Sequence, residues 1–144
     1  MKLTIGRVDK ADFPELQLSD IDLKIDSGAY TSSIHCADIE EKSENGEAII
    51  KFTLLDEEHP LYNKKEFSTK NFSQKLVKSS NGLAEKRYRI KTKIFIFNQT
   101  FDIYLTLSER SEMKYPILLG RKFLNSKFVI DTAKKNISHK LKNK

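Results

Sequence analysis

Apolar and polar residues alternate along several stretches of the chain, a period of two that is typical of half-buried strands. Residues 21–25 read Ile-Asp-Leu-Lys-Ile and lead directly into Asp26. Residues 48–55 form a second run rich in apolar residues, preceded by Asn45-Gly46 and followed by three acidic residues. We therefore expect two strands here, the first of which ends at an aspartate.

The longest alternating pattern predicts a hairpin over residues 88–107. Positions 90, 92, 94 and 96 and positions 101, 103, 105 and 107 hold apolar residues or threonine, with charged, polar or aromatic residues between them. Asn98-Gln99 is the predicted turn, because asparagine suits a short connection between two strands. A further turn is predicted at residues 79–82, which read Ser-Ser-Asn-Gly.

Toward the C-terminus, a short apolar run ends at Gly120. Residues 121–125 then fit one or two helical turns, and residues 128–130 fit a last short strand. No internal repeat is evident, and residues 56–82 are the least regular part, where we expect a mobile loop. Strand patterns dominate, so the chain is predicted to be all-β.

Composition narrows the class of protein. The 144 residues, 38% of them hydrophobic and 32% charged, suit a single folded domain rather than a disordered chain. The one cysteine, Cys36, has no partner for an internal disulfide, which indicates a reducing compartment. No apolar run is long enough for a signal peptide or a membrane span, so we predict a cytoplasmic protein without membrane contact.

The net charge of +6 is concentrated near the C-terminal end, where five lysines fall in the last eleven residues. We expect a domain over residues 1–136 and a solvated basic tail over residues 137–144. A basic surface can also bind nucleic acid, which leaves open a small β-barrel that binds oligonucleotides. The tail has no aromatic residue for base stacking, so nucleic acid is not the partner that we expect.

Two motifs carry the candidate chemistry. The triplet Asp-Ser-Gly at residues 26–28 follows an alternating strand, and Ala29 follows the triplet. Taken alone it is a weak signal, because an aspartate and a glycine also make an ordinary turn after a strand. The second motif, Pro-Ile-Leu-Leu-Gly-Arg at residues 116–121, is longer and more specific, and the combination of the two is informative.

With both motifs the chain resembles the retropepsins, which are small aspartic peptidases. It resembles more closely a bacterial retropepsin-like aspartic peptidase family that carries the label ATP-dependent zinc protease. The resemblance implies a closed, all-β, retropepsin-like (acid protease) barrel with one short helix after the Leu-Leu-Gly-Arg motif. It assigns three groups of residues: the catalytic Asp26, the active-site loop of Ser27, Gly28 and Ala29, and the structural support of Leu119, Gly120 and Arg121.

An aspartic peptidase needs two carboxylates that share one proton, one to activate water and one to donate to the scissile carbonyl. The resemblance implies that a symmetric homodimer supplies them, one Asp26 from each subunit. The expected function is an aspartic-type endopeptidase, a hydrolase that acts on a peptide or protein substrate beneath a flap drawn from residues 56–88. The alternative is a catalytically silent retropepsin-fold module that binds a peptide or a partner enzyme.

Other candidate residues carry weaker signals. Residues 131–133 (Asp-Thr-Ala) look like a second Asp-Thr-Gly, but alanine lacks the conformational freedom of glycine, so we expect no catalytic loop there. His35, His59 and His139 lack the spacing of a metal site, and neighbouring residues such as His35 and Cys36 point to opposite faces of a strand. No glycine-rich phosphate loop is present. We predict neither a metal nor a cofactor, although the family label mentions zinc and ATP.

Overall fold

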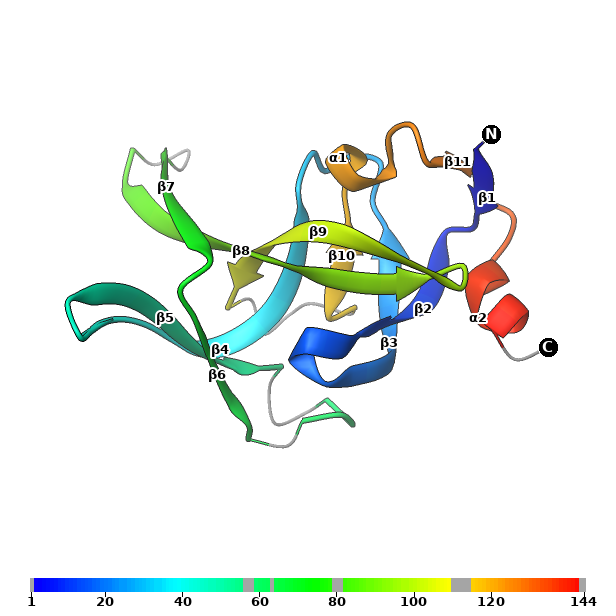
Figure 1. The fold of residues 1–144 in the computed structure, drawn as a ribbon. Coiled ribbons are helices and arrows are strands. Elements are labelled where there is room, and N and C mark those ends of the chain that lie inside the picture. Colours follow the sequence, from blue (N-terminus) through cyan, green and yellow to red (C-terminus); the bar gives the residue numbers. More distant parts are fainter. Residues whose placement is uncertain (1, 56–58, 63, 79–81, 110–114, 143–144) are drawn as a thin grey trace.

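The computed structural model describes residues 2–55, 59–62, 64–78, 82–109 and 115–142. Strands make up most of these ranges and the helices are short (Figure 1). The strands are β1 (Leu3–Ile5), β2 (Val8–Phe13), β3 (Leu18–Ile25), β4 (Ser32–Glu44), β5 (Glu47–Leu54), β6 (Glu66–Thr69), β7 (Phe72–Lys78), β8 (Ala84–Ile96), β9 (Gln99–Ser108), β10 (Ile117–Leu119) and β11 (Phe128–Ile130). The helical segments are η1 (Pro14–Leu16), α1 (Arg121–Leu124) and α2 (Ile137–Lys142).

Six strands close into a barrel, in the order β10, β3, β2, β8, β9, β4. Closure depends on β10, which pairs in parallel with β3 and antiparallel with β4. A closed barrel leaves none of these six strands with an unpaired edge along its whole length. The predicted all-β closed barrel is confirmed, and α1 begins at Arg121, where the short helix is expected.

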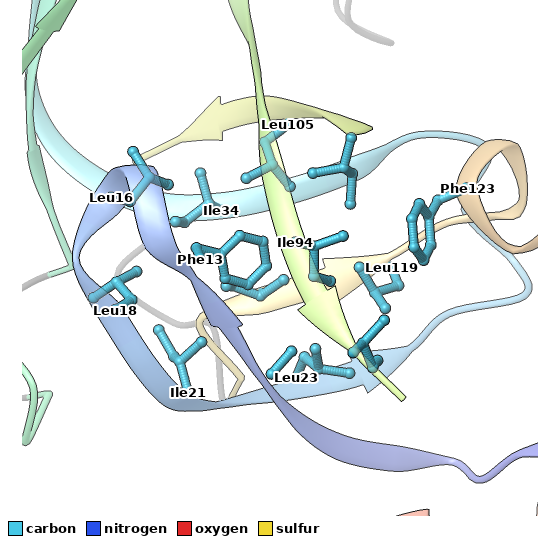
Figure 2. Close-up of a cluster of buried hydrophobic side chains, with 14 of the residues drawn as sticks. Phe13, Leu16, Leu18, Ile21, Leu23, Ile34, Ile94, Leu105, Leu119 and Phe123 are labelled. Carbon is cyan, nitrogen blue, oxygen red and sulfur yellow. The ribbon is translucent and has the colours of Figure 1, made fainter. Parts of the chain in front are cut away.

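The apolar positions of the alternating strands fill the barrel interior (Figure 2). Along β3 the buried residues recur at nearly every second position, and exposed polar residues stand between them. Ile94 of β8 and Leu105 of β9 point inward close to Phe13 of β2. The alternation predicted along the long hairpin is therefore confirmed: its apolar positions are mostly buried, and its charged residues lie on the outer face.

The hairpin between β8 and β9 turns at Phe97-Asn98, one residue earlier than predicted. Ile96 lies opposite Gln99, which leaves a two-residue connection. Both turn residues have positive φ angles, 53° and 55°, as a type I′ turn requires. Phenylalanine is unusual there, but the buried Phe97 ring packs against Phe128 with the ring centroids 5.5 Å apart. Of the other predicted turn, residues 79–81 lie outside the described ranges.

Residues 56–82, predicted to be irregular, contain two strands in the part that the structure describes. β6 pairs with β5, and β7 pairs with β8 over its full length. In Figure 1 the β4–β5 and β7–β8 hairpins both extend beyond the barrel on the same side. The expectation of an irregular segment is wrong for β6 and β7, since their backbone groups are paired with neighbouring strands.

The C-terminal segment is folded rather than solvated. Asp9, only 1% exposed, accepts hydrogen bonds from the backbone N–H groups of Ser138 and His139 at 3.0 and 3.1 Å. Lys142 contacts carboxylates of Asp12 and Asp20 at 2.7 and 2.9 Å. The expectation of a solvated tail is therefore wrong for residues 137–142, which form α2 against β2. Among the described residues, no helix has the length and apolar character needed to cross a bilayer.

Candidate functional site

Asp26 lies at the point where β3 leaves the barrel, half-buried, and its position is set by backbone hydrogen bonds. Its N–H donates to the carbonyl oxygen of Leu119 at 2.9 Å, which continues the parallel pairing of β3 with β10. Its Oδ1 accepts from the N–H of Gly28 at 3.0 Å. The hydrogen bond to Gly28 closes a short ring within residues 26–28, which fixes the direction of the Asp26 carboxylate. Oδ2 is left without a hydrogen bond from the described protein residues.

Residues 119–121 face the Asp26 loop from β10 and α1. A Cβ atom on Gly120 would lie 2.5 Å from the carbonyl oxygen of Thr31, so only glycine allows this approach. Arg121 donates its backbone N–H to Ala29 O at 2.8 Å and its Nη1 to Ser27 O at 2.9 Å. The structure therefore brings the two predicted motifs into contact, while the predicted catalytic and supporting roles stay predictions.

Asp26 opens into a groove of about 700 Å³. Its lining comes from the Asp26 loop, β4, β8, β9 and β10, and comprises Asp26, Ala29, Thr31, Ser33, Ile39, Lys86, Arg87, Tyr88, Thr106, Leu107, Ser108, Glu109 and Leu118. Two carboxylates and two cations thus share one groove. The contributions of β8 and β9 were not apparent from the sequence, because only the strand pairings reveal which ends of the long hairpin lie beside Asp26.

The triplet at residues 131–133 is built in the same way as the Asp26 loop, at the end of β11. Asp131 N–H donates to Ile5 O at 2.9 Å, and Asp131 Oδ1 accepts from the N–H of Ala133 at 3.0 Å. Gly6 and Arg7 then follow Ile5 as Gly120 and Arg121 follow Leu119. The chain therefore contains a short internal repeat, contrary to the prediction, and both copies use a Gly-Arg pair to hold an Asp loop.

The second copy matches the first bond by bond. The N–H of Arg7 donates to Lys134 O at 2.9 Å, and its Nη1 lies 3.4 Å from Thr132 O. A Cβ atom on Gly6 would lie 2.3 Å from Lys134 O. No residue of this second loop is among those that line the Asp26 groove, and the absence of a catalytic role for residues 131–133 stays a prediction.

His35 and Cys36 are both buried on β4. Burial raises the pKa of the Cys36 thiol to about 12, so the side chain stays protonated at neutral pH. His139 lies in α2, 3.6 Å from an Asp20 carboxylate oxygen, and His59 accepts a hydrogen bond from the N–H of Leu61. Within the described ranges, no three His, Cys, Asp or Glu side chains are grouped so that they would hold a metal ion.

A closed barrel in which an Asp-Ser-Gly loop is held by a Leu-Gly-Arg segment defines a retropepsin-like protein. A family model for RimB-like proteins, described as retropepsin-like aspartic endopeptidase RimB, matches residues 4–141, and the chain belongs to this family. The fold is similar to that of a protein of unknown function from Legionella pneumophila, with a TM-score of 0.69 and 23% identity. The match covers 96% of this chain and 99% of the Legionella chain.

Curated relatives of the chain are named probable alpha-L-glutamate ligases. One from Shewanella pealeana is 35% identical over 136 residues, which are 92% of this chain and 29% of the relative. One from Parasynechococcus marenigrum is 31% identical over 134 residues, which are 90% of this chain and 28% of the relative. The chain therefore spans under a third of the length of the curated relatives that it matches.

These names correct the predicted function. The expected aspartic-type hydrolase of peptide bonds is wrong, because the relatives that cover nearly the whole chain are named ligases. The alternative, a module that binds a peptide or a partner enzyme without catalysis, gave the chain no part in ligation and is corrected in that respect. The resemblance to the retropepsin-like family is confirmed. The homodimer stays a prediction.

Proposed function

We propose that this chain takes part in α-L-glutamate ligation, as the domain that holds a glutamate-rich peptide. The observation that carries the proposal is the identity of 35% along 92% of the chain to a probable alpha-L-glutamate ligase. If such a ligase joins glutamate residues to one another, its product is a peptide with a carboxylate on every residue. A domain that accompanies such a reaction needs an open groove with cations at its wall.

The Asp26 groove meets that requirement in its shape and in the placement of its charges. Lys86 and Arg87 line it from β8, where their side chains would pair with glutamate carboxylates. Asp26 lines the same groove and has an oxygen available to accept N–H groups of the peptide backbone or its terminal ammonium. Glu109 also lines the groove, so we expect the acidic side chains of the peptide to lie toward Lys86 and Arg87.

The test is an isothermal titration of the purified chain with α-linked tetraglutamate at low salt, in which calorimetry measures the affinity. A tetraglutamine peptide of equal length is the control for charge. Binding of tetraglutamate should weaken as salt is added, because surface charges are screened over about 10 Å at 0.1 M salt. Equal binding of the two peptides, or binding of neither, would contradict the proposal.

A pair of matched variants localises the binding. Lys86→Gln with Arg87→Gln should weaken tetraglutamate binding by about three- to tenfold, as two solvent-accessible ion pairs would. Lys134→Gln with Lys135→Gln removes two adjacent exposed lysines outside the groove and should leave binding unchanged. We place this activity in the cytoplasm, because a single buried thiol suits a reducing compartment.

A further inference from the structure

A row of cations runs along the outer face of β8, away from the barrel interior. Arg87, Arg89 and Lys91 alternate with residues of the inner face such as Ile90, which is buried. Side chains two positions apart on a strand share a face and stand roughly 6.8 Å apart. Arg87 also lines the Asp26 groove, so the row begins at the groove and continues along the outside of the hairpin.

The row meets an exposed tyrosine on the neighbouring strand. Tyr104 of β9 lies opposite Lys91 and is 42% exposed. The Arg89 guanidinium carbon lies 4.4 Å from the centre of its ring, and the Lys122 amine, from α1, lies 5.3 Å from it. Three cations thus surround one aromatic ring, with Lys91 6.0 Å from the ring centre as the third.

A hollow of about 200 Å³ accompanies this cluster and adjoins the groove. Arg89, Tyr104 and Lys122 line it together with Thr31, which also lines the Asp26 groove. Asp102 lines it as well, but its carboxylate is paired with Lys93. Among the described residues, Arg89, Lys91 and Lys122 have no carboxylate partner within ion-pair distance, so their charges are available to a ligand.

We propose that Arg89, Lys91 and Lys122, gathered around Tyr104, form a second subsite that binds carboxylates of an extended acidic peptide leaving the Asp26 groove. This inference rests on the proposed function. It adds the path that the peptide takes beyond the groove and the residues that recognise its carboxylates. In an extended peptide, side chains on one face also recur every two residues, at the same spacing as Arg87, Arg89 and Lys91. The subsite therefore binds every second glutamate in register with β8.

The occupant is an acidic peptide rather than a nucleic acid because of how Tyr104 is covered. Stacking of a base requires an open aromatic face. Here Arg89 and Lys122 both lie over the Tyr104 ring, and Arg89 is held by a hydrogen bond from its Nε to Ser73 Oγ at 3.2 Å. The Tyr104 ring therefore holds Arg89 and Lys122 in place, and these cations would bind carboxylates of the peptide.

Two peptides of equal length and equal charge test the register. One alternates glutamate and alanine over eight residues, and the other repeats Glu-Glu-Ala-Ala over eight residues. The alternating peptide should bind about threefold more tightly, because all its carboxylates fall on one face of an extended chain. Amide shifts measured by NMR on the wild-type chain should include Arg89, Lys91, Tyr104 and Lys122 in addition to the groove.

Variants on the same strand locate the effect. Arg89→Gln with Lys91→Gln should weaken octaglutamate by about five- to tenfold while leaving tetraglutamate within about twofold. Lys134→Gln with Lys135→Gln is the matched control, because both lysines are exposed and line neither the groove nor the hollow, and it should change neither affinity. A parallel titration uses a single-stranded oligonucleotide of eight bases.

Each outcome decides between the two proposals. Binding of acidic peptides with no preference for the alternating sequence, or an equal loss with Lys134→Gln and Lys135→Gln, overturns the subsite and leaves the proposed function standing. Binding of no acidic peptide overturns both. Tighter binding of the oligonucleotide than of octaglutamate overturns the assignment of the subsite to a peptide.

Discussion

The described part of the chain contains two Asp loops of nearly the same construction, and of these two the Asp26 loop lines the groove of about 700 Å³ while the Asp131 loop does not. In each, the aspartate N–H bonds to a strand carbonyl at 2.9 Å and its Oδ1 accepts an N–H two residues later at 3.0 Å. In each, a Gly-Arg pair approaches from the facing segment. The local motif therefore defines a way of ending a strand, and it does not by itself define a site.

What differs is the chain that follows each loop. After Asp26 the chain enters β4, which runs through the barrel wall beside β9 and leaves the groove open next to the carboxylate. After Asp131 the chain turns into α2, and Lys134 lies 3.9 Å from the second carboxylate oxygen of Asp131. The same turn is thus a groove wall in one place and a helix connection in the other.

The largest loss of stability should come from substituting the two glycines, Gly120 and Gly6, that pack closely against the backbone of the two loops. Gly120→Ala places a methyl group against the backbone of Thr31, and Gly6→Ala places one against Lys134. Each should cost about 3 kcal/mol of unfolding free energy in urea, because the contact atoms belong to the backbone. Gly46→Ala is the control: it meets no atom within 4 Å but has a φ of +79°, and should cost about 1 kcal/mol. Similar losses in all three would contradict the packing argument.

The next effect concerns α2, which follows the second loop. Asp9→Ala removes the acceptor of the Ser138 and His139 N–H groups and should cost about 2 kcal/mol of unfolding free energy. Tetraglutamate affinity should be unchanged at temperatures where the variant is folded, because Asp9 does not line the groove. Asp22→Ala, which breaks an exposed ion pair with Lys10, should be nearly neutral. A loss of peptide binding in Asp9→Ala would show that the two regions are coupled.

A pair of asparagine variants compares the two loops directly. Asp26→Asn and Asp131→Asn both keep an oxygen that accepts the N–H two residues later, so both should stay within about 0.5 kcal/mol of the parent stability. Only Asp26→Asn removes a charge from the groove. Because Asp26 is proposed to accept N–H groups of the peptide, this variant should weaken tetraglutamate binding about fivefold, or by about 1 kcal/mol. An equal effect of both variants on affinity would mean that the groove does not distinguish them.

The smallest effect is a dependence of stability on pH near α2. A hydrogen bond from Lys142 lowers the pKa of Asp20 below its ordinary value of 3.8. The resulting stabilisation is present above that value and is lost as the pH falls through the lowered pKa in the folded protein. Lys142→Met should therefore be less stable than the parent at neutral pH, and the difference in unfolding free energy should shrink in acid. Lys135→Met, an exposed lysine, should show no such trend.

The sequence was sufficient for elements whose pattern is local. Alternation along residues 88–107 predicts β8 and β9 and their buried face, and the run ending at Gly120 predicts β10 and α1. The position of the turn at Phe97-Asn98 was missed, because a phenylalanine with positive φ is stabilised there by distant contacts with Phe128. Helix α2 was missed because its lysines suggest solvent, while its attachment depends on Asp9 at the other end of the chain.

The residues of the candidate site also fall into those that the sequence could identify and those that it could not. Asp26 and Gly120 could be selected from their motifs, and their contact was expected from the resemblance. Lys86 and Arg87 could not, because a charged residue on a strand gives no sign of which distant strand lies beside it. The similarity of residues 5–7 (Ile-Gly-Arg) to residues 119–121 (Leu-Gly-Arg) covers only three positions, and it gains a structural meaning from the hydrogen bond between Asp131 N–H and Ile5 O.

The position of β10 has a consequence for the order in which the chain folds. β3 and β4 follow each other in sequence, but β10 lies between them in the barrel. During synthesis both strands emerge from the ribosome long before β10 is available, and Arg121 reaches a carbonyl 94 positions earlier. We expect the nascent chain to expose two unpaired strand edges until then, a state that is slow to resolve and prone to aggregate.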